Sequence, residues 1–91
     1  MKSSEEYVPA RDSIEEEVLK EVRELLNQFE MGIKHNIHQM GLSSLDSLLL
    51  TNRLSRLGYQ VALRDIISSI NVEEIASKIR LSKKNLEIKF Q

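Results

Sequence analysis

The sequence contains no cysteine and no tryptophan, and it has only one proline, three glycines, two tyrosines and two phenylalanines. Without cysteine, disulfide bonds and thiolate metal sites are excluded. With so few aromatic residues, the core must be aliphatic. No apolar run approaches the roughly 18–20 residues of a membrane span, and the start, MKSSEEYVPARD, lacks the apolar segment of a secretory signal. We therefore expect a cytoplasmic protein that does not bind membranes.

The length and composition describe a small soluble domain. The chain has 91 residues, of which 41% are hydrophobic and 30% are charged. These fractions are ordinary for a globular protein and too apolar for a disordered one. A chain of this size forms one domain, which leaves little room for a deep substrate cleft. We expect a monomer that is not itself an enzyme.

The charges are unevenly distributed, although the formal net charge is only −1. Residues 1–30 carry nine acidic and four basic side chains, whereas residues 78–91 carry five basic side chains and one acidic one. Five cations without an aromatic platform are too few for a nucleic-acid interface. We expect a solvated basic tail and no binding to nucleic acid.

Apolar residues that recur at steps of three and four predict a first helix over residues 13–29. Two capping boxes fit its start equally well, Asp12 with Glu15 and Ser13 with Glu16. The segment that follows shows no regular spacing of apolar residues, so we predict a loop. That loop, residues 30–43, nevertheless contains five apolar residues that we expect to pack on the core: Met31, Ile33, Ile37, Met40 and Leu42.

A second helix is predicted to begin at Ser43 or Ser44 and to end near Leu57, because a glycine follows it. A short helical turn over residues 63–68 and a last helix capped by Asn71 complete the pattern. In the tail, three apolar residues alternate as in a short strand, although a single strand would have no partner: Leu86, Ile88 and Phe90.

These elements predict an all-α fold, a small four-helix bundle with three main helices, one short helix and a long first loop. We expect one core, formed by Ile14, Val18, Val22, Leu25, Leu54, Val72, Ile75 and Ile79. The chain divides into a linker or lead-in segment, the domain itself and the basic C-terminal tail, at residues 1–11, 12–81 and 82–91.

Several familiar chemistries fit the sequence poorly. His35 and His38 are spaced for a shared metal, but no carboxylate or thiolate accompanies them. The segment Gly41–Leu45 resembles the hydrolase motif GxSxG, but it lacks the second glycine and a preceding strand. No phosphate-binding glycine loop is present. A serine at the start of a helix remains, and such a serine is usually only a cap.

Four segments follow one another in the order and spacing of a known family. The motif segment is MGLSSLDSLLLTNRLSRLG at residues 40–58. The others are EYVPARDSIEEEVLKEV, MGIKHNIHQMG and LRDIISSINVEEIASKI, at residues 6–22, 31–41 and 63–79. Together they resemble the phosphopantetheine carrier family, whose motif reads LGxDSL, and they are most similar to peptidyl carrier domains of nonribosomal peptide synthetases. The resemblance covers roughly residues 6–80.

Two serines compete for the attachment site of the family. Asp46-Ser47-Leu48 reproduces the letters DSL, but the family glycine lies three residues before the serine, as Gly41 lies before Ser44. In the family pattern, an Arg-Leu pair and an Arg-Asp element follow the serine at characteristic distances. Arg53-Leu54 and Arg64-Asp65 match these distances when they are counted from Ser44. The resemblance therefore favours Ser44 over Ser47, with the motif neighbours Gly41, Leu42, Ser43 and Leu45.

The resemblance implies a 4'-phosphopantetheine arm esterified to Ser44, and a carrier that performs no bond chemistry itself. It implies a phosphopantetheinyl transferase as one partner, and adenylation, condensation, ketosynthase or thioesterase-type enzymes as the others. The candidate partner interface consists of Met40, Leu45, Leu49 and Arg64. The alternative for Leu45 and Leu49 is that they complete the core. Ser43 stands where the family usually has Asp or His, which could alter recognition by the transferase.

Three alternatives stay open. The first is a polyketide-type acyl carrier. Residues 44–57 contain one acidic residue, Asp46, and two basic ones, Arg53 and Arg56, which is unlike the acidic second helix of fatty-acid carriers. This charge balance favours a peptidyl carrier over the polyketide type. An unmodified helical interaction module is the second alternative. A helix-turn-helix nucleic-acid binder is the third, and the near-neutral charge of its candidate helices argues against it.

Overall fold

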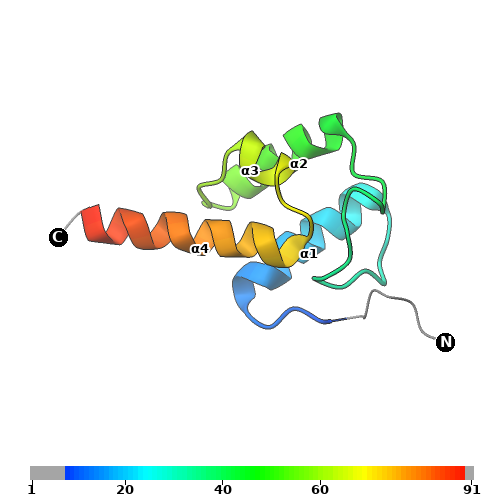
Figure 1. Cartoon of the computed structure of the whole chain (residues 1–91), viewed down its shortest axis with the longest axis horizontal. Coiled ribbons are helices and arrows are strands. Elements are labelled where there is room, and N and C mark those ends of the chain that lie inside the picture. Colours follow the sequence, from blue (N-terminus) through cyan, green and yellow to red (C-terminus); the bar gives the residue numbers. More distant parts are fainter. Residues whose placement is uncertain (1–7, 90–91) are drawn as a thin grey trace.

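The computed structural model describes the backbone of residues 8–89 and the side chains of residues 8–82 (Figure 1). Its helices are α1 (Ser13–Leu26), α2 (Ser44–Arg56), α3 (Leu63–Ile67) and α4 (Val72–Lys89). Three are long and one is short, and no strand occurs over residues 8–89. The expected all-α four-helix fold is confirmed.

Helix α1 begins where the sequence offers a cap. Asp12 accepts a hydrogen bond from the backbone N–H of Glu15 (2.8 Å), so of the two candidate caps this one is used. The helix ends before the predicted residue 29, because Asn27 adopts the left-handed conformation (φ 56°) and closes the last turn. Phe29, the last residue of the range predicted for this helix, consequently lies outside it and is 62% exposed.

Helix α4 begins at the predicted cap and extends further than the sequence pattern indicated. Asn71 accepts a hydrogen bond from the N–H of Glu74 (2.9 Å), and the carboxylate of Glu74 accepts one from the N–H of Ile70 (2.8 Å). The helix continues to Lys89, so the alternation at Leu86 and Ile88 does not correspond to a strand. Isolated strands have no partner for their backbone, whereas a helix satisfies its own. Phe90 lies outside the described residues.

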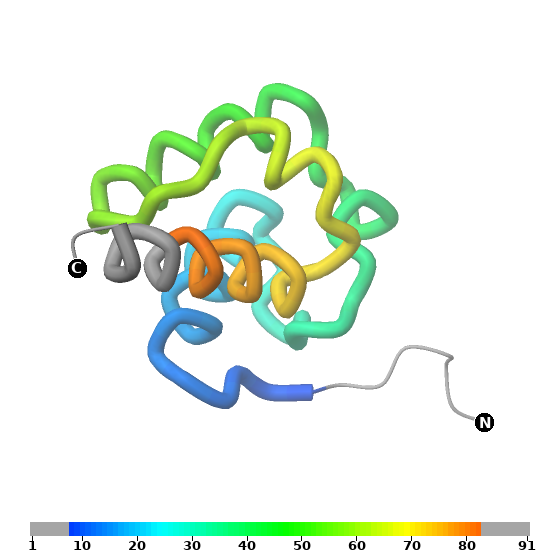
Figure 2. Tube along the Cα trace, turned by 60° about the vertical axis from the view of Figure 1, so that its left-hand side comes forward, coloured from blue at the N-terminus to red at the C-terminus, as the bar shows by residue number. Residues whose placement is uncertain are grey.

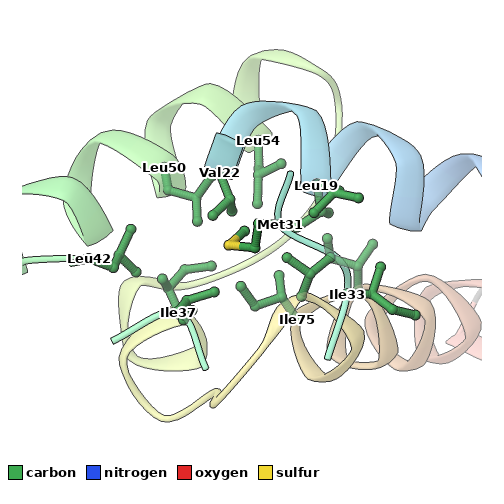
Figure 3. Close-up of a cluster of buried hydrophobic side chains, with 13 residues drawn as sticks. Leu19, Val22, Met31, Ile33, Ile37, Leu42, Leu50, Leu54 and Ile75 are labelled. Carbon is green, nitrogen blue, oxygen red and sulfur yellow. The ribbon is translucent and has the colours of Figure 1, made fainter. Parts of the chain in front are cut away.

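The core lies between the helices and includes the long first loop (Figure 3). Six of the eight residues expected to form it are buried, and Ile14 and Leu25 are partly buried and pack against it. The loop residues Met31, Ile33 and Ile37 are no more than 1% exposed. The expectation that the loop packs on the core is confirmed.

The chain path brings the loop beside the start of α4 (Figure 2). Helix α1 packs against α2 and α4, and α3 packs against the same two helices. The N–H of Glu73 donates to the carbonyl of Ile33 (3.1 Å), and the N–H of Ile37 donates to the carbonyl of Ile70 (2.9 Å). These bonds fix the loop immediately before α2. No helix within residues 8–89 is both long and apolar enough to cross a membrane.

A buried carboxylate joins the N-terminal segment to two helices. Glu15 is 1% exposed and accepts hydrogen bonds from the guanidinium groups of Arg11 (2.8 Å) and Arg80 (3.2 Å). Arg11 also pairs with Glu73 of α4 (2.7 Å), and the carbonyl of Val8 accepts from the N–H of Ile33 (2.8 Å). Residues 8–11, expected to be part of a linker or lead-in segment, are therefore attached to the domain.

Replacing the Glu15 carboxylate by an amide, Glu15→Gln, is expected to remove a pH-dependent part of the stability. Hydrogen bonds from Arg11 lower the pKa of Glu15 from 4.5 to about 2. A group with a lowered pKa stabilises the fold fully above pH 4.5, and that stabilisation is lost as the pH falls toward 2. Urea unfolding at neutral pH should show a loss of about 1–3 kcal/mol, and the variant should lose less further stability between pH 5 and pH 2 than the wild type.

The exposed neighbour supplies the control for this experiment. Glu16→Gln removes the same charge from the same helical turn, but Glu16 is exposed. It should change the free energy of unfolding by no more than about 0.5 kcal/mol. Equal effects of the two substitutions would contradict a specific role for the buried carboxylate.

Candidate functional site

Ser44 is the first residue of α2 and is exposed. The loop before it is anchored by Leu42, which is 6% exposed and donates its N–H to the carbonyl of Ile37 (3.0 Å). Gly41, between this anchor and the preceding turn, has φ 116°, a conformation that side-chain-bearing residues rarely adopt. An anchored turn thus presents the hydroxyl of Ser44 at the start of the helix.

Ser43, one residue earlier, caps α2 in a reciprocal pair with Asp46. The hydroxyl of Ser43 accepts a hydrogen bond from the N–H of Asp46, and the carboxylate of Asp46 accepts one from the N–H of Ser43, both at 3.1 Å. This is a capping box. Ser43 therefore fills the structural role of an N-cap, a role for which Asp and Ser are both favoured residues.

Ser47, the competing serine, lies one turn inside the helix and faces the core. Its side chain is 2% exposed, and its hydroxyl donates to the carbonyl of Ser43 (3.1 Å). A large group on this oxygen would have to displace core residues. Of the two serines, only Ser44 offers a hydroxyl at the surface.

The two histidines form hydrogen bonds with the backbone, His35 within the loop and His38 with the segment that follows α3. Nδ1 of His35 accepts from the N–H of Gly32 (2.9 Å), and Nε2 of His38 donates to the carbonyl of Ser69 (2.8 Å). Within the part of the chain that the structure describes, no cluster of three or more His, Asp or Glu side chains could hold a metal ion.

The side of α2 that faces away from the core carries apolar residues. Leu45 is 64% exposed and Leu49 is 40% exposed, whereas Met40 is half-buried and Arg64 of α3 is exposed. All four residues suggested as a partner interface are thus at least partly accessible. Sequence reasoning did not single out Leu48, which is 46% exposed on the same side of α2. Its spacing of three residues from Leu45 is the signal that could have found it.

Comparison with known proteins identifies the family. Residues 16–79 match the family described as a phosphopantetheine attachment site. The chain belongs to this family. Its carrier domain is 32% identical over 76 residues to bacitracin synthase 3 of Bacillus licheniformis, and 38% identical over 78 residues to cyclosporin synthetase of Tolypocladium inflatum. No solved structure matches it significantly.

The relatives are far larger than the carrier domain. The match covers 82% of this chain but 1% of bacitracin synthase 3, and 85% of this chain but a share of cyclosporin synthetase that rounds to 0%. A match to a plipastatin synthase of Bacillus subtilis covers 93% of this chain and 3% of that synthase polypeptide, at 26% identity. Each relative therefore resembles this carrier domain over only a small part of its length.

Members of this family carry 4'-phosphopantetheine on a serine, and the start of α2 fits such a group. The capping box uses the N–H groups of Ser43 and Asp46. The N–H groups of Ser44 and Leu45 have no acceptor within the helix, because the first turn lacks preceding carbonyls. These two N–H groups and the helix dipole favour a phosphate beside the Ser44 hydroxyl.

Proposed function

We propose that this chain holds acyl, aminoacyl or peptidyl intermediates on a 4'-phosphopantetheine arm esterified to Ser44. The observation that carries the choice of serine is the contrast in accessibility: Ser44 is exposed at the helix start, whereas Ser47 is 2% exposed and hydrogen-bonded. When bound, the arm supplies a terminal thiol on which intermediates are carried as thioesters. The chain's own residues position the arm and perform no bond chemistry.

The relatives suggest the pathway. Two of them are named as synthases of bacitracin and plipastatin and a third as a synthetase of cyclosporin. We infer that this carrier serves a comparable assembly of nonribosomal peptides, or a hybrid of it. The partners would be a phosphopantetheinyl transferase and enzymes of the adenylation, condensation, ketosynthase or thioesterase type. The carrier unit that we propose spans residues 12–81, flanked by residues 1–11 and the basic residues 82–91.

Intact mass measurement tests the central proposal. The full chain is incubated with coenzyme A and a broad-specificity phosphopantetheinyl transferase, and a mass gain of one phosphopantetheine group per chain is expected. Tandem mass spectrometry of the modified peptide should assign the group to Ser44. A chain that gains no mass with any transferase, including after Ser43→Asp restores the usual motif residue, would be an unmodified helical module instead.

Leu45→Asp is expected to weaken partner recognition without unfolding the domain. Leu45 is 64% exposed, and an acidic residue in the first turn interacts favourably with the helix dipole. The melting temperature should therefore change little. The rate of modification by the transferase at low carrier concentration should fall about tenfold, because loss of an apolar anchor at an interface costs about 1–2 kcal/mol.

A second exposed leucine provides the matched control. Leu81 of α4 is 61% exposed, so Leu81→Asp introduces the same charge at similar exposure on another helix. Its modification rate should equal that of the wild type. If Leu45→Asp unfolds the domain, or if both variants slow modification equally, Leu45 is not a partner contact.

A further inference from the structure

Helix α2 is apolar on two opposite sides. Leu50 and Leu54 face the core and are fully buried. Leu45, Leu48 and Leu49 lie on the outward side, at helical spacing, and are 40–64% exposed. Helix α3 packs beside α2 and exposes Leu63 and Ile67, at 37% and 52%. We call these five exposed residues, together with Arg56 and Arg64, the α2–α3 surface.

The carboxylates near this surface are engaged in helix caps. Within residues 31–70, all of which the structure describes, the acidic residues are Asp46 and Asp65. Asp46 accepts from the N–H of Ser43 (3.1 Å), and Asp65 accepts from the N–H of Ala62 (2.9 Å). Both side chains are only partly exposed. Their negative charge is directed to the positive ends of their own helices.

The two arginines of this surface, Arg56 and Arg64, are in a different environment from Arg53, the neighbouring arginine of α2. Arg53 pairs with Glu21 (3.1 Å) and Glu24 (3.3 Å) of α1 and so belongs to the α1–α2 contact. Arg56 and Arg64 are both exposed. The α2–α3 surface therefore combines exposed leucine and isoleucine with exposed positive charge.

The opposite sign of charge is concentrated elsewhere. Residues 1–30 carry nine acidic and four basic side chains, and the exposed carboxylates of α1 include Glu16, Glu17 and Glu24. A partner with a negative docking site is repelled from α1 and attracted to the arginines of the α2–α3 surface. A charge distribution of this kind orients the encounter and discriminates among partners.

We propose that the α2–α3 surface binds a partner domain whose docking site is an apolar patch bordered by carboxylates. This inference rests on the proposed function, because the surface begins next to Ser44, and it adds the charge of the partner. The apolar patch covers the exposed leucines, and the carboxylates pair with Arg56 and Arg64. A basic docking site would place like charges opposite each other and would be rejected.

Two synthetic amphipathic helical peptides test the proposal. They share one leucine face and differ only in its flanking residues, which are glutamate in one peptide and lysine in the other. Binding to the full chain is measured by fluorescence polarisation, and the contact site by amide shifts in NMR spectra. The glutamate-flanked peptide should bind about 2- to 10-fold more tightly, as expected for two exposed ion pairs. The preference should shrink as the ionic strength rises above about 0.15 M.

Charge variants test whether Arg56 and Arg64 cause the preference for the glutamate-flanked peptide. Arg56→Glu combined with Arg64→Glu should reverse the preference between the peptides, whereas Lys20→Glu on the exposed side of α1 should leave it unchanged. Equal binding, preference for the lysine-flanked peptide, no binding of either peptide, or amide shifts confined to α1 would overturn the proposal. So would binding to phosphatidylglycerol vesicles in place of the peptides, because the surface would then recognise an anionic membrane.

The test is independent of the modification of Ser44. The peptides bind the unmodified chain, and the mass gain with coenzyme A is measured separately on the same preparations. A chain that gains mass but shows no preference for the glutamate-flanked peptide contradicts the charge inference alone. A chain that shows the preference but gains no mass contradicts the carrier function alone.

Discussion

Ser44→Ala is expected to abolish the mass gain from coenzyme A completely, because it removes the oxygen to which the arm would be esterified. The fold should be almost unaffected. Ser43, rather than Ser44, caps α2, and Ser44 is exposed. The free energy of unfolding should therefore change by no more than about 0.5 kcal/mol. Intact mass and circular dichroism of the same sample separate loss of the site from loss of the fold.

Ser47→Ala is the matched control, because it removes the same hydroxyl one turn further along the helix. Its hydroxyl donates a hydrogen bond to the carbonyl of Ser43, which also accepts from the N–H of Ser47. The substitution should cost about 1 kcal/mol or less and leave the mass gain intact. If Ser44→Ala gained mass and Ser47→Ala did not, the attachment site would be Ser47. The literal DSL string would then have been a better guide than the distance from Gly41.

The start of each helix could be predicted from the sequence, but the end of α1 and the extent of α4 could not. Caps such as Asp12 and Asn71 are local, so they appear in the sequence. The end of α1 depends on the left-handed conformation of Asn27, which Asn adopts only in some contexts. The alternation of Leu86, Ile88 and Phe90 resembles that of a strand, but a strand there would have no partner, and the backbone is helical to Lys89.

The candidate site shows the same division between local and tertiary information. The spacing between Gly41 and Ser44 points to one serine, and the turn that needs φ 116° explains the glycine. Sequence alone could not decide which leucines of α2 are exposed, because leucine occurs on both sides of the helix. Only packing against α1 and the loop makes Leu50 a core residue and Leu45 a surface residue.

The core between α1 and α4 is where single substitutions should have the largest effect on stability. Val22 of α1 and Ile75 of α4 are both fully buried, and these two helices pack together. Truncating a buried isoleucine to alanine costs about 2–5 kcal/mol, because apolar contacts are lost and a cavity remains. A domain of this length has a total stability on the order of 5 kcal/mol.

We therefore expect Ile75→Ala to lower the free energy of unfolding by about 2–4 kcal/mol and to bring the domain close to unfolding at 37 °C. Val22→Ala removes fewer methyl groups and should cost about 1–3 kcal/mol. Urea unfolding followed by circular dichroism measures both. Leu81→Ala, on the same helix as Ile75 but 61% exposed, should change stability by no more than about 0.5 kcal/mol. If Ile75→Ala were as stable as Leu81→Ala, α4 would not be packed on α1. Ser44 would then be presented by a scaffold different from the bundle described above.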